Sequence, residues 1–288
     1  MKITVYTPVF NKADKLDPLF ESLKEQTYRN FEWLIIDDGS QDGITSKSFK
    51  YFADANNFRV RYFNKTYGGR HTAFNFGLEK AEGDAIITVD ADEILLPDAL
   101  EKADNFLEEA KNSDKIIGIA LNKLDENSNP KGTSPKEKYR DIKLNEKEKY
   151  NITGNKTYAF YIDKIRKFPM PMFYGEFCFP QDEYLDSVTS AEGYKVRFLN
   201  DACVISPDYK YEWVRYYDPA EKLMKDNPKG YGKLYSAKAA AAKSKSEKAS
   251  IYSEFRKMMK SNYSDDEIAS FLGTDKKTLK LSSILGKK

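Results

Sequence analysis

Short apolar runs alternate with helix-length apolar patterns through the first hundred residues of this 288-residue chain. This alternation is typical of α/β domains, in which helices connect the parallel strands of a sheet. Strands are expected at residues 3–7, 31–36, 60–63 and 85–89, and the clearest helices at 16–23 and 70–81. The sequence therefore predicts an α/β fold with a mostly parallel central sheet flanked by helices.

The remainder of the chain is less regular. Residues 122–150 are polar and are expected to form loops and short elements. Further strands are expected at 157–162, 196–199 and 203–206, a helix at 181–192, and one long Ala/Lys-rich helix at 236–260. A C-terminal helical appendage is therefore predicted.

Composition excludes several kinds of site. His71 is the only histidine, so a His-rich zinc site is excluded and general-base chemistry falls to a carboxylate. The two cysteines, Cys178 and Cys203, are too few for a disulfide framework and are interpreted as reduced core thiols. No apolar run approaches the roughly 20 residues of a membrane span, and no secretory signal is visible, so a cytoplasmic protein is expected.

Charge is distributed unevenly along the chain. The last 60 residues carry 14 Lys or Arg against 6 Asp or Glu, although the whole chain has a net charge of only +2. A basic tail favours weak contact with an anionic surface or a nucleic acid, and contact with a membrane would make the protein peripheral. A solvated, lysine-rich helix face is the alternative interpretation.

Polar clusters follow the expected strands of the first hundred residues. Asn11 follows the first, Asp37-Asp38 the second, Gly68-Gly69-Arg70 the third, and Asp90-Ala91-Asp92 the fourth. The carboxyl ends of parallel strands share one edge of a sheet, where α/β folds bind their ligands. Two carboxylates one residue apart suit a divalent cation that carries a phosphate-bearing substrate, whereas solvated loop or cap residues are the alternative. The chain lacks G-x-G-x-x-G after a strand and lacks a P-loop, which argues against dehydrogenases and P-loop enzymes.

Four segments, in this order along the chain, resemble the motifs of family 2 glycosyltransferases with the GT-A fold. They are Thr7-Pro8-Val9-Phe10-Asn11, Asp37-Asp38-Gly39-Ser40, residues 68–77 and Asp90-Ala91-Asp92. The similarity covers about the first 100 residues and returns between about 173 and 231. It implies a nucleotide-diphospho-sugar transferase domain at 1–232, with a donor-binding half at 1–100 and an acceptor-side half at 101–232, followed by the basic helical appendage at 233–288.

The resemblance also implies which residues bind the donor. The backbone near Pro8 and a carboxylate of the Asp37-Asp38 turn would hold the nucleotide, with Asp38 accepting the imide N–H of uracil. Arg70 would lie near the diphosphate at a helix N-terminus. The full set implied for nucleotide-sugar binding is Thr7, Pro8, Val9, Asn11, Asp37, Asp38, Gly69, Arg70, Asn75, Asp90 and Ala91. An ordinary acidic turn and a solvated arginine are the alternatives.

The metal and the catalytic base follow from the same resemblance. Asp92 would ligate Mn²⁺ or Mg²⁺, with Asp90 beside it. Asp182 aligns with the catalytic aspartate of the family, and Glu183 and Glu176 are the other candidates. The family's usual glutamate before that aspartate is Gln181 here, a departure that puts the local electrostatics in doubt. A helix N-terminal carboxylate is the alternative role for Asp182.

The resemblance implies an inverting, metal-dependent transferase that moves a sugar from a nucleotide-diphospho-sugar, in particular a UDP-sugar, to an acceptor hydroxyl. The acceptor would be a glycan, a lipid-linked molecule or another hydroxyl compound. A nucleotidyltransferase and a non-catalytic sugar-nucleotide-binding module tethered through its tail are the alternatives. Residues 264–281 resemble a helix-turn-helix, for which a packing element or a contact between copies in a homo-oligomer is an equal explanation.

Overall fold

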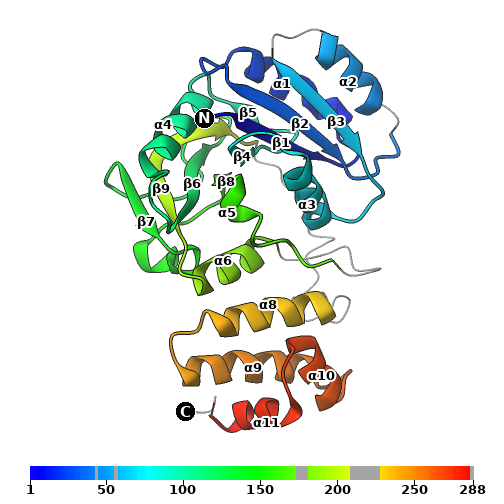
Figure 1. Cartoon of the computed structure of the whole chain (residues 1–288), viewed down its shortest axis with the longest axis vertical. Coiled ribbons are helices and arrows are strands. Elements are labelled where there is room, and N and C mark those ends of the chain that lie inside the picture. The colour runs from blue at the N-terminus through cyan, green and yellow to red at the C-terminus, as the bar shows by residue number, and fades with distance from the viewer. Residues whose placement is uncertain (43–44, 55–57, 173–180, 208–227, 286–288) are drawn as a thin grey trace. The chain divides into compact units, whose positions relative to one another are not determined.

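The computed structural model describes residues 1–42, 45–54, 58–172, 181–207 and 228–285 (Figure 1). By their contacts the residues form two compact units, one of 1–169 with 194–209 and one of 170–193 with 210–288. The expected border at 232/233 lies inside one helix, Pro228–Ala240, so the compact units differ from the expected ranges. The assignment of separate functions to 1–232 and 233–288 stays a prediction.

The first unit contains a nine-stranded sheet in the order β3-β2-β1-β4-β8-β6-β9-β5, with β7 also paired to β9. Strands β3, β2, β1 and β4 are parallel, as is the β6–β9 pair, whereas β8, β5 and β7 pair antiparallel with their neighbours. The strands are β1 (Ile3–Val9), β2 (Phe31–Asp37), β3 (Arg59–Asn64), β4 (Ala85–Thr88), β5 (Ile94–Leu95), β6 (Ile116–Leu124), β7 (Tyr139–Ile142), β8 (Lys156–Tyr161) and β9 (Lys195–Ile205). The α/β prediction is confirmed, with the parallel strands concentrated in the N-terminal half.

Helices flank this sheet because their apolar stripes match its buried faces. In α1, the residues Leu16, Leu19, Phe20 and Leu23 are fully buried and pack in the same core as Trp33 of β2. The helices of the first unit are α1 (Leu16–Lys24), α2 (Thr45–Asp54), α3 (Arg70–Lys80), α4 (Ala99–Ala110) and α5 (Ile162–Ile165), with 3₁₀ turns at Ala13–Lys15, Leu144–Glu146 and Glu148–Tyr150. Cys203 lies in this core as a free thiol, and burial raises its pKa to about 12.

The second unit is helical where the structure describes it. Its helices are α6 (Gln181–Ala191), α8 (Pro228–Ala240), α9 (Lys245–Met259), α10 (Asp265–Leu272) and α11 (Lys276–Leu285). Tyr235, Phe255, Met259, Ile268 and Leu279 are among the buried side chains that join α8 to α11 in one core. No helix among the described residues is both long enough and apolar enough to span a bilayer.

The polar stretch 122–150 begins with the last residues of β6 and then contains only short elements, β7 and two 3₁₀ turns, among the described residues, as expected. Two other sequence expectations were wrong in detail. The strands expected at 196–199 and 203–206 are one strand, β9. Register shifts in the β6–β9 pairing accommodate the polar residues of β9 without ending it. The long helix expected at 236–260 is two helices, because Ser244 caps a new one by accepting a hydrogen bond from the amide of Glu247.

Gly77 of α3 lies against the ring of Tyr6 on β1. A Cβ at Gly77 would lie 2.6 Å from Cε2 of Tyr6, a side chain that is 1% exposed and packs edge-on against Phe74. We expect Gly77→Val to lower the free energy of unfolding by about 2 kcal/mol, because overpacking a rigid core costs about 1–3 kcal/mol. Urea denaturation measures this, and Glu79→Val on the exposed face of α3 is the matched control, with an effect within about 0.5 kcal/mol.

Candidate functional site

The loops after β1 and β2 are joined by hydrogen bonds in which backbone amides are the donors. Asn11 adopts the left-handed conformation (φ 50°), and its amide donates to Oγ of Ser40 at 2.9 Å. Its own Oδ1 accepts from the amide of Gln41 at 2.8 Å, and the amide of Asp38 donates to the carbonyl of Val9 at 2.8 Å. Asparagine suits this position because it tolerates positive φ and its short amide bonds locally. The first two predicted motifs therefore form one edge of the sheet.

Asp37 closes the turn after β2. Its carboxylate accepts from the amide of Ser40 at 2.8 Å and from the hydroxyl of Tyr62 on β3. Burial disfavours the charged form, but the hydrogen bonds from Ser40 and Tyr62 outweigh it and hold the pKa of Asp37 below its usual value. Since Asp37 is only 3% exposed, its contacts are those of a residue that shapes the turn.

Asp38 links this turn to the glycine loop before α3. One carboxylate oxygen accepts from the amide of Gly68 at 3.0 Å and from the ammonium of Lys65, and the other accepts from the amide of Gly69 at 2.8 Å. Gly69 is the N-cap of α3 with φ 88°, a conformation that favours glycine. The carboxylate of Asp38 thus positions the glycine loop before α3.

An exposed aromatic pair lies beside these loops. Phe10 is 44% exposed and Tyr67 is 43% exposed, and their ring centroids are 4.6 Å apart. Phe10 adjoins Asn11 and Tyr67 adjoins the Gly68 amide that contacts Asp38. Sequence reasoning assigned neither residue a role, although large exposed aromatics next to a predicted nucleotide site are a signal for base stacking.

The Asp90-Ala91-Asp92 turn after β4 is paired with two cationic side chains. Arg70 at the start of α3 lies 2.7 Å from Oδ1 of Asp90, and Nζ of Lys12 lies 2.6 Å from Oδ2 of Asp92. Burial disfavours the charged form of Asp90, but the positive charges of Arg70, Lys123 and Lys12 outweigh it, so its pKa is lowered. Asp90 and Asp92 therefore each lie beside a cationic side chain at this edge of the sheet.

Glu93 and Lys123 form an ion pair that contacts the backbone of this turn. Nζ of Lys123 on β6 lies 2.6 Å from Oε1 of Glu93, while Oε2 of Glu93 accepts from the amide of Asp90 at 3.0 Å. Glu93 is 2% exposed, and its burial raises its pKa despite the charge of Lys123. Sequence reasoning missed Lys123, which follows the apolar run of β6 as the predicted motifs follow their own strands.

The remaining predicted donor residues lie at the same edge, with different exposure. The side chains of Thr7, Val9 and Ala91 are buried, and Thr7 Oγ1 accepts from Nε1 of Trp33 at 3.0 Å. Pro8 is half-buried, as is Asn75 on α3. His71 is 2% exposed and burial lowers its pKa, which agrees with a packed residue rather than a catalyst.

The segment of sequence that forms this edge of the sheet matches a known family. The sequence model of the family described as glycosyl transferase family 2 matches residues 4–166, which is more than half of the 288 residues. The chain belongs to glycosyltransferase family 2. The matched region contains β1 to β4 and all four predicted motifs.

Relatives in this family match part of the chain. An uncharacterized glycosyltransferase of Haemophilus influenzae is 36% identical over 105 residues, which are 36% of this chain and 42% of that protein. Glycosyltransferase GlyG of Streptococcus pneumoniae is 32% identical over 120 residues, 42% of this chain and 39% of that protein. The match spans less than half of the length of these curated relatives.

Solved structures share the fold. S. aureus TarS in complex with UDP-GlcNAc has a TM-score of 0.62 and 20% identity, covering 91% of this chain and 73% of that chain. The mannosyltransferase PcManGT from Pyrobaculum calidifontis, in complex with GDP-Man and Mn²⁺, has a TM-score of 0.56 and 14% identity, covering 99% and 86%. At these identities the likeness concerns the fold, and the GT-A prediction is confirmed at that level.

The candidates for the base in this family 2 chain lie on α6, within the second unit. Asp182 is exposed in the first turn of α6 and makes no ion pair within the part of the chain that the structure describes. The carboxylate of Glu183, in contrast, lies 2.6 Å from Nζ of Lys238 on α8. Oε1 of Gln181 is buried without a hydrogen-bond partner among the described residues. Glu176 lies outside the described residues.

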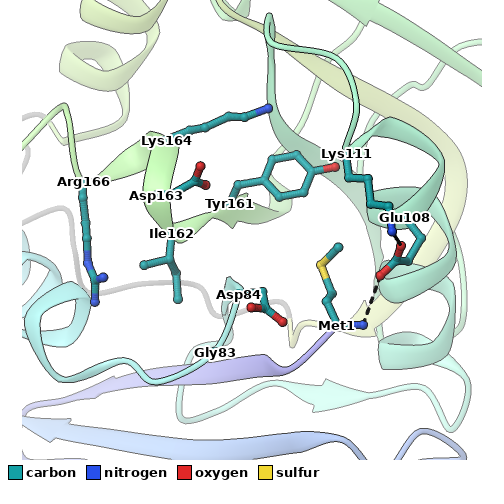
Figure 2. Close-up of a pocket in the computed structure, with 10 residues that line it drawn as sticks. All are labelled: Met1, Gly83, Asp84, Glu108, Lys111, Tyr161, Ile162, Asp163, Lys164 and Arg166. Atoms are coloured by element: carbon teal, nitrogen blue, oxygen red, sulfur yellow. Dashed lines mark hydrogen bonds and ion pairs between the residues drawn. The ribbon is translucent and has the colours of Figure 1, made fainter.

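A cavity of about 520 Å³ lies elsewhere on the first unit, at the amino ends of β1 and β4 (Figure 2). Several of its charged groups are paired: the Met1 ammonium lies 3.3 Å from Glu108, and Nζ of Lys164 donates to the carbonyl of Ile116 at 2.7 Å. None of the predicted motif residues lines it. The donor site is therefore sought at the carboxyl edge and not in this cavity.

Proposed function

We propose that this chain is an inverting, metal-dependent glycosyltransferase that transfers a sugar from a UDP-sugar to an acceptor hydroxyl. The observation that carries the proposal is the pairing of Asp90 and Asp92 with Arg70 and Lys12 at the carboxyl edge of the parallel strands. The two carboxylates could bind a divalent cation, and the two cationic side chains could bind the oxygens of the diphosphate. TarS, which shares the fold, was solved with UDP and with UDP-GlcNAc, and this supports a uridine nucleotide.

The nucleoside end of the donor would lie on the loops after β1 and β2. Phe10 offers an exposed face on which a base can stack. Asp38 is 4% exposed and its oxygens accept from Lys65, Gly68 and Gly69, so in the donor complex its carboxylate would accept from the imide N–H of uracil in place of one of these donors. Asn11, with its backbone in the left-handed conformation, keeps these two loops together. Arg70, 54% exposed at the N-terminus of α3, is placed to donate to phosphate oxygens.

The residues fit a divalent cation in the donor complex. Among the described residues no group of three or more His, Cys, Asp or Glu forms a protein-only metal site, so Asp90 and Asp92 would hold the ion together with diphosphate oxygens. Bound there, Mn²⁺ or Mg²⁺ would neutralise the charge of the leaving diphosphate. The Mn²⁺ bound by PcManGT supports this choice of metal.

The acceptor hydroxyl must lose a proton as it attacks the anomeric carbon. Asp182 is the candidate base because it is exposed and unpaired among the described residues, whereas Glu183 is paired with Lys238. Direct attack opposite the leaving group inverts the anomeric configuration. The acceptor class would be a glycan, a lipid-linked molecule or another hydroxyl compound.

A panel of donors tests the proposal. The full chain is incubated with Mn²⁺ and UDP-glucose, UDP-galactose, UDP-GlcNAc or GDP-mannose, and released nucleotide is measured with and without candidate acceptors. The proposal is supported if UDP is released from one of the UDP-sugars and if this release requires Mn²⁺. Binding without any turnover would favour the non-catalytic module, for which Gln181 is the specific sequence feature. Release of pyrophosphate from a nucleoside triphosphate would favour a nucleotidyltransferase.

Asp38→Asn should weaken UDP binding by about tenfold, or about 1.4 kcal/mol. Asparagine keeps the shape but replaces one acceptor oxygen by a donor, so it loses the imide contact and at least one bond to the amides of Gly68 and Gly69. Calorimetry with UDP and with Mn²⁺–pyrophosphate separates the two causes. A loss confined to UDP supports base recognition, whereas an equal loss for both ligands would assign Asp38 to positioning of the loop alone.

A further inference from the structure

Helices α10 and α11 are joined by a three-residue turn. Gly273 ends α10 with φ 64°, and its amide and that of Thr274 bond back to the last turn of the helix. A Cβ at Gly273 would meet nothing within 4 Å, so the glycine is explained by its backbone conformation. Asp275 opens α11 by accepting from the amide of Thr278 at 2.8 Å and from its hydroxyl at 2.7 Å.

The inner faces of both helices share a core with α9. Ile268, Leu272 and Leu279 are at most 1% exposed, and they pack in the cluster that contains Phe255 and Met259 of α9. Figure 1 shows α9 between α8 and α11 in this unit, with α10 at one end. Two short helices crossing at a glycine turn and braced by a third are the arrangement of a helix-turn-helix.

The outer face of α11 is polar and basic. Lys276, Lys277, Thr278 and Lys280 are exposed, while Leu279 between them is buried. Lys276 lies 2.6 Å from Asp266, but Lys277 and Lys280 make no ion pair with any residue that the structure describes. These lysines occupy the N-terminal half of the second helix, which is the part that enters the major groove in helix-turn-helix proteins.

The acidic residues at the start of α10 contact other residues of the second unit. Asp265 lies 2.9 Å from Nε of Arg256 and 3.1 Å from Nζ of Lys260, and these partners lower its pKa well below the usual range. Glu267 completes a capping box with Ser264. Near the turn, Lys277 and Lys280 on α11 are exposed cations without an ion pair among the described residues, whereas the carboxylates of Glu267 and Asp275 accept hydrogen bonds from the neutral groups of Ser264 and Thr278.

We propose that the α10–α11 pair binds double-stranded DNA, with α11 in the major groove and Lys277 and Lys280 on backbone phosphates. This partner is independent of the proposed transfer reaction. A second copy of the chain would bring the same lysines face to face, which like-charge repulsion disfavours. A membrane would require an apolar face, but the exposed side chains of residues 276–280 are Lys276, Lys277, Thr278 and Lys280, which are all polar.

The experiment uses the full chain and a fluorescein-labelled 30-base-pair duplex of mixed sequence in an anisotropy titration. Binding is expected in the micromolar range at 50 mM salt and should weaken steeply with salt, as phosphate contacts do. K277A/K280A should weaken binding at least tenfold at 50 mM salt and reduce the slope of log K against log salt by about 1.8, or about 0.9 for each lost phosphate contact. K136A/K167A, which removes two exposed lysines of the first unit, is the matched control and should leave both values unchanged.

K277R/K280R keeps the charge and should keep the affinity, which separates lost contacts from misfolding of α11. Methyl green, a major-groove ligand, should compete with the protein, whereas the minor-groove ligand netropsin should not. The proposal is overturned if the duplex does not bind below 100 µM at 50 mM salt, or if both lysine pairs lower its affinity equally. It is also overturned if netropsin alone competes, or if vesicles with 30% phosphatidylserine bind in preference to DNA.

Discussion

Asp92→Asn is expected to abolish sugar transfer and to weaken metal-dependent UDP binding by more than about 100-fold. Removal of a group that only hydrogen-bonds to a metal ligand typically costs about 10–100-fold in metal affinity or activity. Loss of a ligand itself should exceed the upper end of that range. Asp92 is 5% exposed at its side chain, and its Oδ2 lies 2.6 Å from Nζ of Lys12. Asparagine keeps the size but removes the charge that would hold the cation. Calorimetry with UDP, with and without Mn²⁺, and initial rates of nucleotide release measure the effect.

Two further variants make the result specific to Asp92. Asp163→Asn, on α5 at the amino ends of the strands, removes the same charge far from the motifs in sequence and should change neither value. Lys12→Met tests whether Asp92 acts only by holding Lys12. If it does, Lys12→Met and Asp92→Asn should lower the affinity for UDP equally, and the loss should be the same with and without Mn²⁺. Unchanged metal-dependent UDP affinity in Asp92→Asn would remove the metal assignment.

The convergence of the motifs could be predicted because it follows from chain topology. Asn11, Asp38 and Asp90 each follow a strand, and the strands β2, β1 and β4 are neighbours and parallel. Residues that follow parallel strands must meet at one edge, whatever the side chains between them. The contacts from Asn11 to Ser40 and from Arg70 to Asp90 agree with this expectation.

The partners that set the charges of the edge could not be predicted in the same way. Lys123 reaches Glu93 from β6, which lies beyond α4 in the chain, and the order of the sheet after β4 is not sequential. Lys123 lies in the stretch 122–150 that was expected to form loops and short elements, although the apolar run before it forms most of β6. Lys65, in contrast, directly follows β3, the parallel neighbour of β2, so its contact with Asp38 follows from the same topology as the motifs. The contact of Lys123 depends on tertiary packing, and no local pattern indicates it.

The helix break at Ser244 has a local signal that hydrophobic periodicity obscures. Residues 236–260 are rich in alanine and lysine, which favour a continuous helix. Ser244, however, is followed three residues later by Glu247, whose carboxylate accepts from the amide of Lys243 while Ser244 accepts from the amide of Glu247. This serine–glutamate spacing is a helix start signal, and it ends one helix by capping the next.

Asp182→Asn is expected to lower turnover by about 10²-fold or more while leaving UDP affinity unchanged, because loss of a general base costs about 10²–10⁴-fold. Asparagine preserves the shape of an exposed residue in the first turn of α6 and removes only its basicity. Since Asp182 makes no ion pair among the described residues, no structural contact of that kind is lost with it. Steady-state rates and UDP calorimetry on the same preparation provide the measurement.

Glu183→Gln and Glu176→Gln distinguish Asp182 from the other candidates. Glu183 is paired with Lys238, so its replacement should loosen that contact between α6 and α8 and change turnover much less than Asp182→Asn. If turnover is near normal in Asp182→Asn and falls in either glutamate variant, the base is that glutamate. The anomeric configuration of the product tests the mechanism itself: inversion is expected for one direct displacement, and a retained configuration would require a different mechanism in which Asp182 is not a simple proton acceptor.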